Sequence, residues 1–241
     1  MQLSERLGTA LGRAIAPLFA STSRGRHART FHPWGDLVRI TVEPVPVDEL
    51  RLVRLGRALA GQGIARFSNA LWKAARWPDA LGCAIALHDP KQHLLFATIQ
   101  RPWTTLLAPF STHVENYLAN DFFAVSPFRA PGLDRIWLRL HPEHPPPPGR
   151  HDWRERRARL QHAIASGEAT LELAASPRPR GPFTAFARVT AHELYGADPP
   201  ALVFDPFVND RGVEPIGFIH ALRKGAYAGS WRGRGTPALP A

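Results

Sequence analysis

Two side chains in the C-terminal part of the chain have the types and spacing of an iron ligand and its partner. Arg223 and Tyr227 are four residues apart, so in a helix they share one face. A guanidinium beside the phenol of Tyr227 would favour the phenolate and lower the pKa of that phenol. A phenolate is a hard, anionic oxygen ligand that suits ferric iron. The other interpretation of this spacing is an exposed arginine stacked on a tyrosine.

A histidine motif lies in the N-terminal part. Residues 29–35 read Arg-Thr-Phe-His-Pro-Trp-Gly, which is an R-x-x-H-x-x-G pattern centred on His32. His27 lies in an overlapping run without the glycine three places on, and we therefore favour His32. An imidazole can act as a general acid and base near neutral pH. The other interpretation is a surface histidine in a basic linker.

A third motif, Arg66-Phe-Ser68, follows the histidine motif along the chain. An arginine forms bidentate pairs with carboxylates, and a serine hydroxyl can fix the tautomer of an imidazole. Three letters are not specific, so the motif gains its weight from its order after the histidine motif.

The order of these motifs resembles that of the catalase family, and short catalase-related proteins in particular. Residues 202–207 read Leu-Val-Phe-Asp-Pro-Phe, similar to the family's F-D/N-P strand end. Residues 215–227 read Pro-Ile-Gly-Phe-Ile-His-Ala-Leu-Arg-Lys-Gly-Ala-Tyr, similar to its R-x-x-x-Y helix, with His220 where the family has asparagine. Residues 82–87 and 94–98 resemble two of its paired strands. The resemblance covers most of residues 24–232 and is strongest at both ends.

The resemblance implies a haem b domain. Tyr227 would ligate the iron from the proximal side, and Arg223 would keep it ionised. Arg66 and Arg29 would pair with the haem propionates.

On the distal side, the resemblance implies that His32 transfers the proton between the peroxide oxygens and that Ser68 orients it. At the position of the family's distal asparagine, this sequence has Ala97, followed by Thr98. Asn116 and Asn120 lie on the next expected helix. We therefore expect turnover of peroxide or organic hydroperoxides that is peroxidatic more than catalatic. A hydroperoxide rearrangement of the allene-oxide-synthase kind is a related expectation.

The composition bounds these expectations. The 241 residues are 44% hydrophobic, which indicates a folded globular protein, and the net charge is +10. The charge would suit an anionic partner, but the arginines are scattered, so we expect no specific nucleic acid. The alternatives are a haemless catalase-like binding or interaction protein and a basic nucleic-acid-binding domain. A homo-oligomer is compatible with the family.

The cellular setting follows from the single cysteine and the apolar runs. Cys83 is the only cysteine, so no internal disulfide forms, which fits a cytoplasmic protein. No apolar run reaches the roughly 18 residues of a membrane span. His141, His144 and His151 lie among prolines, and we expect a His-rich loop there instead of a metal site.

The order of the expected helices and strands predicts an α+β fold. The resemblance implies that its core is an antiparallel β-barrel with flanking helices. Residues 1–23 are expected to hold an amphipathic helix, residues 24–232 the haem domain, and residues 233–241 a flexible tail. The other expected helices are 47–60, 110–123, 152–166 and 217–230. The expected strands are 37–42, 82–87, 94–99, 135–140, 169–173, 183–190 and 201–204, with a hairpin turn at 88–92.

Overall fold

The computed structural model describes residues 34–70, 78–100, 108–146, 156–197 and 204–222. The strands in these ranges are β1 (Trp34–Pro44), β2 (Gly61–Asn69), β3 (Leu81–Leu87), β4 (Gln92–Ala97), β5 (Phe122–Ala124), β6 (Phe128–Ala130), β7 (Leu133–Pro142), β8 (Thr170–Ser176), β9 (Thr184–Ala197) and β10 (Glu214–Pro215). The helices are α2 (Leu50–Leu59), α3 (Ala108–Ser111), the 3₁₀ helix η2 (Tyr117–Ala119) and α4 (Arg156–Ala165).

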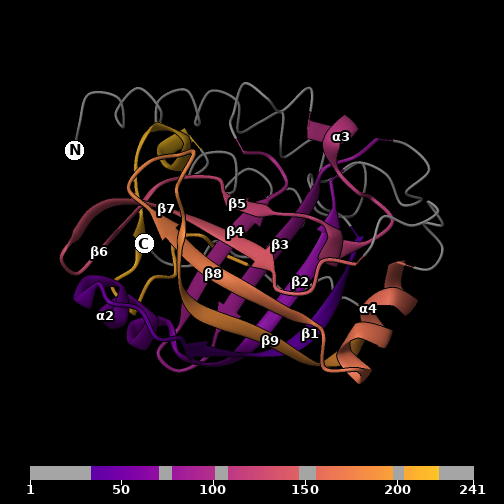
Figure 1. The fold of residues 1–241 in the computed structure, drawn as a ribbon. Helices are drawn as coiled ribbons and strands as arrows, with labels where there is room; N and C mark the ends of the chain where they lie inside the picture. The colour runs from indigo at the N-terminus through magenta and orange to yellow at the C-terminus, as the bar shows by residue number, and fades with distance from the viewer. Residues whose placement is uncertain (1–33, 71–77, 101–107, 147–155, 198–203, 223–241) are drawn as a thin grey trace, which may run out of the picture.

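Eight of the described strands close into an antiparallel barrel (Figure 1). They follow one another in the order β5-β4-β3-β2-β1-β9-β8, and β7 closes the ring by pairing with both β5 and β8. β6 and β10 extend the sheet beyond β7. The expected antiparallel barrel with flanking helices is therefore confirmed.

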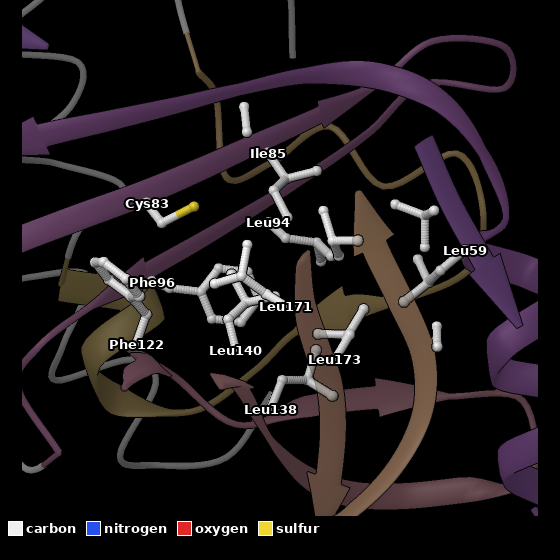
Figure 2. Packing of buried hydrophobic residues seen from close by; sticks show 14 of the residues in the cluster. Leu59, Cys83, Ile85, Leu94, Phe96, Phe122, Leu138, Leu140, Leu171 and Leu173 are labelled. Atoms are coloured by element: carbon white, nitrogen blue, oxygen red, sulfur yellow. The ribbon is translucent and has the colours of Figure 1, made fainter. Parts of the chain in front are cut away.

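The barrel interior is filled by one face of each strand. In β3, Leu81, Cys83, Ile85 and Leu87 are buried, whereas the alternate residues Ala84 and Ala86 are partly exposed. This period of two is the pattern of a sheet with one face on a core. Figure 2 shows labelled side chains from strands β3, β4, β5, β7 and β8 gathered in this interior.

The helices lie outside this ring of strands. α2 packs on β1 and β9, and α4 packs on β9; Figure 1 shows them toward opposite ends of the barrel. In α2, the buried residues Leu52, Leu55 and Leu59 recur at helical spacing and face the core. No helix in the described ranges has the length and apolarity needed to cross a bilayer.

The helix expected at 110–123 is wrong. α3 ends at Ser111, η2 is a single turn, and β5 begins at Phe122. Asparagine side chains replace helical hydrogen bonds here: Asn116 caps η2 by accepting from the Leu118 N–H at 3.0 Å. Short polar side chains of this kind compete with a helix for hydrogen bonds to the backbone. The segment is therefore divided into α3, η2 and β5 instead of forming one helix.

β2 is a strand that the sequence analysis did not predict. Gly61 and Gly63 weaken the strand pattern at its start. The structure gives the reason for Gly63: a β-carbon there would lie 2.4 Å from the Ala86 carbonyl oxygen of β3. The close approach of two backbones requires the glycine that makes the strand hard to recognise.

Most of the other expected helices and strands lie within the described residues and can be compared with the structure. The strands at 37–42, 82–87, 94–99, 135–140, 169–173 and 183–190 are confirmed with shifted ends, as is the helix at 47–60. The helix at 152–166 is confirmed from Arg156 onward, and residues 218–222 of the expected last helix are helical. Phe204 is not in a strand. The terminal segments 1–23 and 233–241, and residues 201–203, lie outside the described residues.

Candidate functional site

A row of small residues crosses four neighbouring strands on the outer face of the barrel. Gly35 of β1 pairs with Ser68 of β2, Ser68 pairs with Gly82 of β3, and Gly82 pairs with Ala97 of β4. Directly paired residues project to the same face of a sheet, and their neighbours along each strand point into the core. The row Gly35–Ser68–Gly82–Ala97 is therefore a smooth strip on the outside of the barrel.

The two expected site residues that are described, Arg66 and Ser68, lie on this face of β2. They are only 3% and 4% exposed. The Ser68 hydroxyl donates to the Gly82 carbonyl oxygen at 3.4 Å. A β-carbon on Gly35 would lie 2.9 Å from Cζ of Arg66 and 2.5 Å from the Phe67 carbonyl oxygen. The glycine of the R-x-x-H-x-x-G pattern and the Arg-Phe-Ser motif are thus side by side.

The other expected site residues lie outside the described residues. They are His32, its alternative His27, Arg29, Arg223 and Tyr227. Their roles in iron ligation, proton transfer and propionate binding remain predictions.

A different tyrosine of the described part, Tyr117, does not fit the role of an anionic ligand. It is 1% exposed in the barrel interior, and its hydroxyl donates to Oδ2 of Asp36 at 3.2 Å. Burial raises the pKa of Tyr117, although the guanidinium of Arg156, 4.9 Å from the ring centre, opposes this shift. Tyr117 therefore stays a phenol, and it is turned away from the outer face.

Neither asparagine near β4 supplies a free distal amide. Asn120 accepts from the His113 N–H at 2.8 Å and donates to the carbonyl oxygens of His113 and Asn116 at 2.9 and 2.7 Å. Asn116 caps η2. Thr98, which follows Ala97, accepts from the Leu81 N–H at 3.0 Å and bonds the Thr112 hydroxyl at 2.9 Å. These polar groups hold the loop after β4 in place.

A pocket of about 520 Å³ opens beside this loop. Its lining includes Thr98, Gln100, His113, Asp121, Phe123 and His141. Asp121 and His141 are joined by a 2.6 Å bond between Oδ1 and Nδ1. His141 is not in the expected His-rich loop but in β7, where β7 pairs with β5. No spacing signal could have joined residues 121 and 141, because their contact depends on that pairing.

The C-terminal resemblance is described only as far as residue 222. The Phe-Asp-Pro-Phe run at 204–207 is a turn, in which the Asp205 carboxylate accepts from the Phe207 N–H at 2.9 Å. The ring of Phe207 lies 4.8 Å from that of His220 between centroids. His220, at the family's asparagine position, thus packs against the turn.

The described residues contain no thiol or metal centre that competes with this site. Cys83 is buried in the core, and burial raises the pKa of its thiol, so it is unreactive. Within the same residues, no three His, Cys, Asp or Glu side chains are placed to hold a metal ion.

Comparison with solved structures finds catalases. A fungal catalase has a TM-score of 0.59 at 10% sequence identity, over 83% of this chain and 57% of that one. A bacterial catalase has a TM-score of 0.60 at 11% identity, over 86% of this chain and 57% of that one. The chain therefore has a catalase-like fold and spans a little over half the length of these catalases. No protein-family model and no curated protein matches it.

Proposed function

We propose that the chain binds haem b against the outer face of β1–β4 and uses it to turn over hydrogen peroxide or organic hydroperoxides. One observation carries this proposal: the barrel brings Gly35, Ser68 and the buried Arg66 together on one face. Those residues come from two separate motifs that resemble the distal and propionate parts of the catalase site. The catalase-like fold supports the same assignment.

The chemistry of this face fits the group. The row Gly35–Ser68–Gly82–Ala97 carries no large side chain, which would suit a flat macrocycle packed against the sheet. Arg66 supplies a buried guanidinium, and guanidinium–carboxylate pairs are the natural partner for a propionate. Arg29 would add a second cation. Haem b, when bound, supplies a ferric iron and the redox chemistry for cleaving the peroxide O–O bond.

The chain's own residues would hold the group and move the proton. Tyr227 would provide the anionic oxygen ligand, and Arg223 would keep that oxygen ionised. His32 would take a proton from one peroxide oxygen and deliver it to the other. Gly35, three residues after His32 along the chain, pairs with Ser68, and Ser68 would orient the imidazole.

Peroxidatic turnover should exceed oxygen release. Oxygen release requires a second peroxide to be held in place, and a distal amide helps to orient it. Ala97 offers no side-chain hydrogen bond, and the amide of Asn120 already makes three hydrogen bonds to the backbone.

The test is an absorption spectrum of the full chain loaded with haemin. We expect a Soret band in wild type and in Tyr195→Phe, which changes a tyrosine that is 39% exposed on β9. Tyr227→Phe should lose or shift the band, and Arg66→Gln should weaken haem binding. A wild-type protein that stays colourless would overturn the proposal and favour a haemless catalase-like binding protein. An unshifted band in Tyr227→Phe would refute the proximal assignment.

A further inference from the structure

The pocket beside β4 and β5 lies on the same face of the barrel as the proposed haem site. The pairing that joins Ser68, Gly82 and Ala97 continues to Phe123 of β5, which lines the pocket. Ser68 and Phe123 are thus three strands apart, about 14 Å at a strand spacing of about 4.8 Å. Thr98, at the end of β4, also lines the pocket.

A histidine held by a carboxylate forms the polar end of this pocket. Asp121 accepts the Nδ1 proton of His141 at 2.6 Å, because a carboxylate can only accept. In a neutral imidazole the other nitrogen, Nε2, is then a hydrogen-bond acceptor. The site therefore offers a base whose tautomer is fixed, suited to a ligand that donates an O–H.

Part of the remaining wall suits a neutral, flat ligand. Phe123, Pro142 and Pro145 give the pocket apolar surfaces for an aromatic ring. The other lining residues are Ala119 and the polar Thr98, Gln100, Ser111, His113 and Asn120. Asp121 disfavours an anion, and Arg139, 3.6 Å from Oδ2 of Asp121, offsets the attraction of that carboxylate for a cation. A volume of about 520 Å³ is in the range of small-molecule sites.

We propose that this pocket binds a small phenol, which donates its hydroxyl proton to Nε2 of His141 and serves as the reducing substrate. The reducing role rests on the proposed function. For each hydrogen peroxide, two phenols lose one electron and one proton each and become phenoxyl radicals. The peroxide takes up the two electrons and two protons and leaves as two waters. His141 receives the proton of each phenol as its electron departs, which avoids a charged phenol cation.

Binding can be tested without haem, by calorimetric titration of the full chain. The probes are p-cresol and p-methylanisole, which differ only in that a methyl group replaces the hydroxyl proton. We expect p-cresol to bind about tenfold more tightly, because one hydrogen bond is lost in the ether. Equal binding of the two probes, or no saturable binding of p-cresol, would overturn the proposal even if no variant can be made.

Variants then locate the site. His141→Phe keeps a planar ring and removes both nitrogens, so it should weaken p-cresol binding about tenfold, by the loss of the same hydrogen bond. His162→Phe changes an exposed histidine of α4 and should leave binding unchanged. Equal effects of the two variants would contradict a site at His141.

The haem-loaded protein separates this proposal from the proposed function. With peroxide, His141→Phe should raise the KM for p-cresol and leave unchanged the KM for ferrocyanide, a donor without a hydroxyl proton. A parallel change in both KM values would refute the donor pocket while leaving the haem site intact. A protein that binds p-cresol at His141 but acquires no Soret band would refute the proposed function and with it the reducing role.

Discussion

The α-carbon of Gly35 lies against the guanidinium of Arg66, so closely that a β-carbon would come within 2.9 Å of Cζ. The contact joins the end of one sequence motif to the start of another, across the β1–β2 ladder. At this contact the two motifs pack directly against each other.

Gly35→Ala should destabilise the protein by about 1–3 kcal/mol, the usual cost of overpacking. The new methyl group would also meet the Phe67 carbonyl oxygen at 2.5 Å, and that backbone atom cannot move aside as a side chain can. Chemical denaturation measures the effect. Gln62→Ala, at an exposed position of the same ladder, should change the free energy of unfolding by no more than about 0.5 kcal/mol. An unchanged unfolding midpoint in Gly35→Ala would show that this contact is loose.

His32→Ala should retain haem and lose peroxide turnover by about 10²- to 10⁴-fold, the usual contribution of a positioned proton-transfer group. His27→Ala is the matched control, since it changes the histidine of the overlapping motif and should leave turnover unchanged. Peroxide consumption by the two haem-loaded variants decides between them. Inactivity of His27→Ala alone would assign the distal role to His27.

Oxygen release should be weak beside dye oxidation when both are measured on one haem-loaded sample. The reason is the side chain of Ala97, which cannot orient a second peroxide. Ala97→Asn should raise the ratio of oxygen released to dye oxidised, because it places an amide in the row that contains Ser68 and Gly82. Vigorous oxygen release by the wild type would contradict this and require another group in that role.

His93 should make the protein less stable in mild acid. The Asp205 N–H donates to Nδ1 of His93 at 2.9 Å, and burial lowers the pKa of His93 below its ordinary value of 6.5, although the Asp205 carbonyl oxygen opposes this. Below pH 6.5 the unfolded chain then binds more protons at this position than the folded protein does. The free energy of unfolding therefore falls as the pH decreases below 6.5.

The matched variant is His93→Asn, whose side-chain oxygen can still accept from the Asp205 N–H but does not titrate. Urea denaturation between about pH 5 and 8 should show a flatter dependence in the variant. Burial raises the pKa of the Asp205 carboxyl above 3.8, which makes stability fall as the pH rises above that value. That slope is common to both proteins, so their difference isolates His93. Parallel curves would show that His93 titrates alike in both states.

Arg211 should contribute strongly to stability, because its guanidinium joins three segments. It donates to the carbonyl oxygens of Pro90 at 2.6 Å, Asp89 at 3.2 Å and Ala58 at 3.3 Å. Arg211→Ala should lower the free energy of unfolding by about 1–3 kcal/mol, since it removes several hydrogen bonds made by a charged donor. Arg39→Ala, which removes an exposed pair with Glu193, should cost no more than about 1 kcal/mol. Equal losses in the two variants would refute the proposed role of Arg211.

Elements with local signals can be predicted from the sequence. Two short apolar runs separated by a turn composition predicted the β3–β4 hairpin, and a helical run closed by Gly61 predicted α2. The order of the motifs along the chain also implies the catalase-like barrel, by resemblance. The hairpin and α2 depend on residues that are near one another along the chain, so the local pattern is enough to predict them.

Contacts between distant segments depend on how the strands pair in the folded chain. β7 closes the barrel by pairing with both β5 and β8, and that closure brings Asp121 to His141. β2 escaped prediction because Gly63, which gives a weak strand signal, is needed where the backbone of β3 comes close. Register across strands sets the row from Gly35 to Ala97, and register is a property of pairs distant in sequence. The register is fixed because it buries the apolar face of all the strands together. The sequence of one strand therefore cannot predict it.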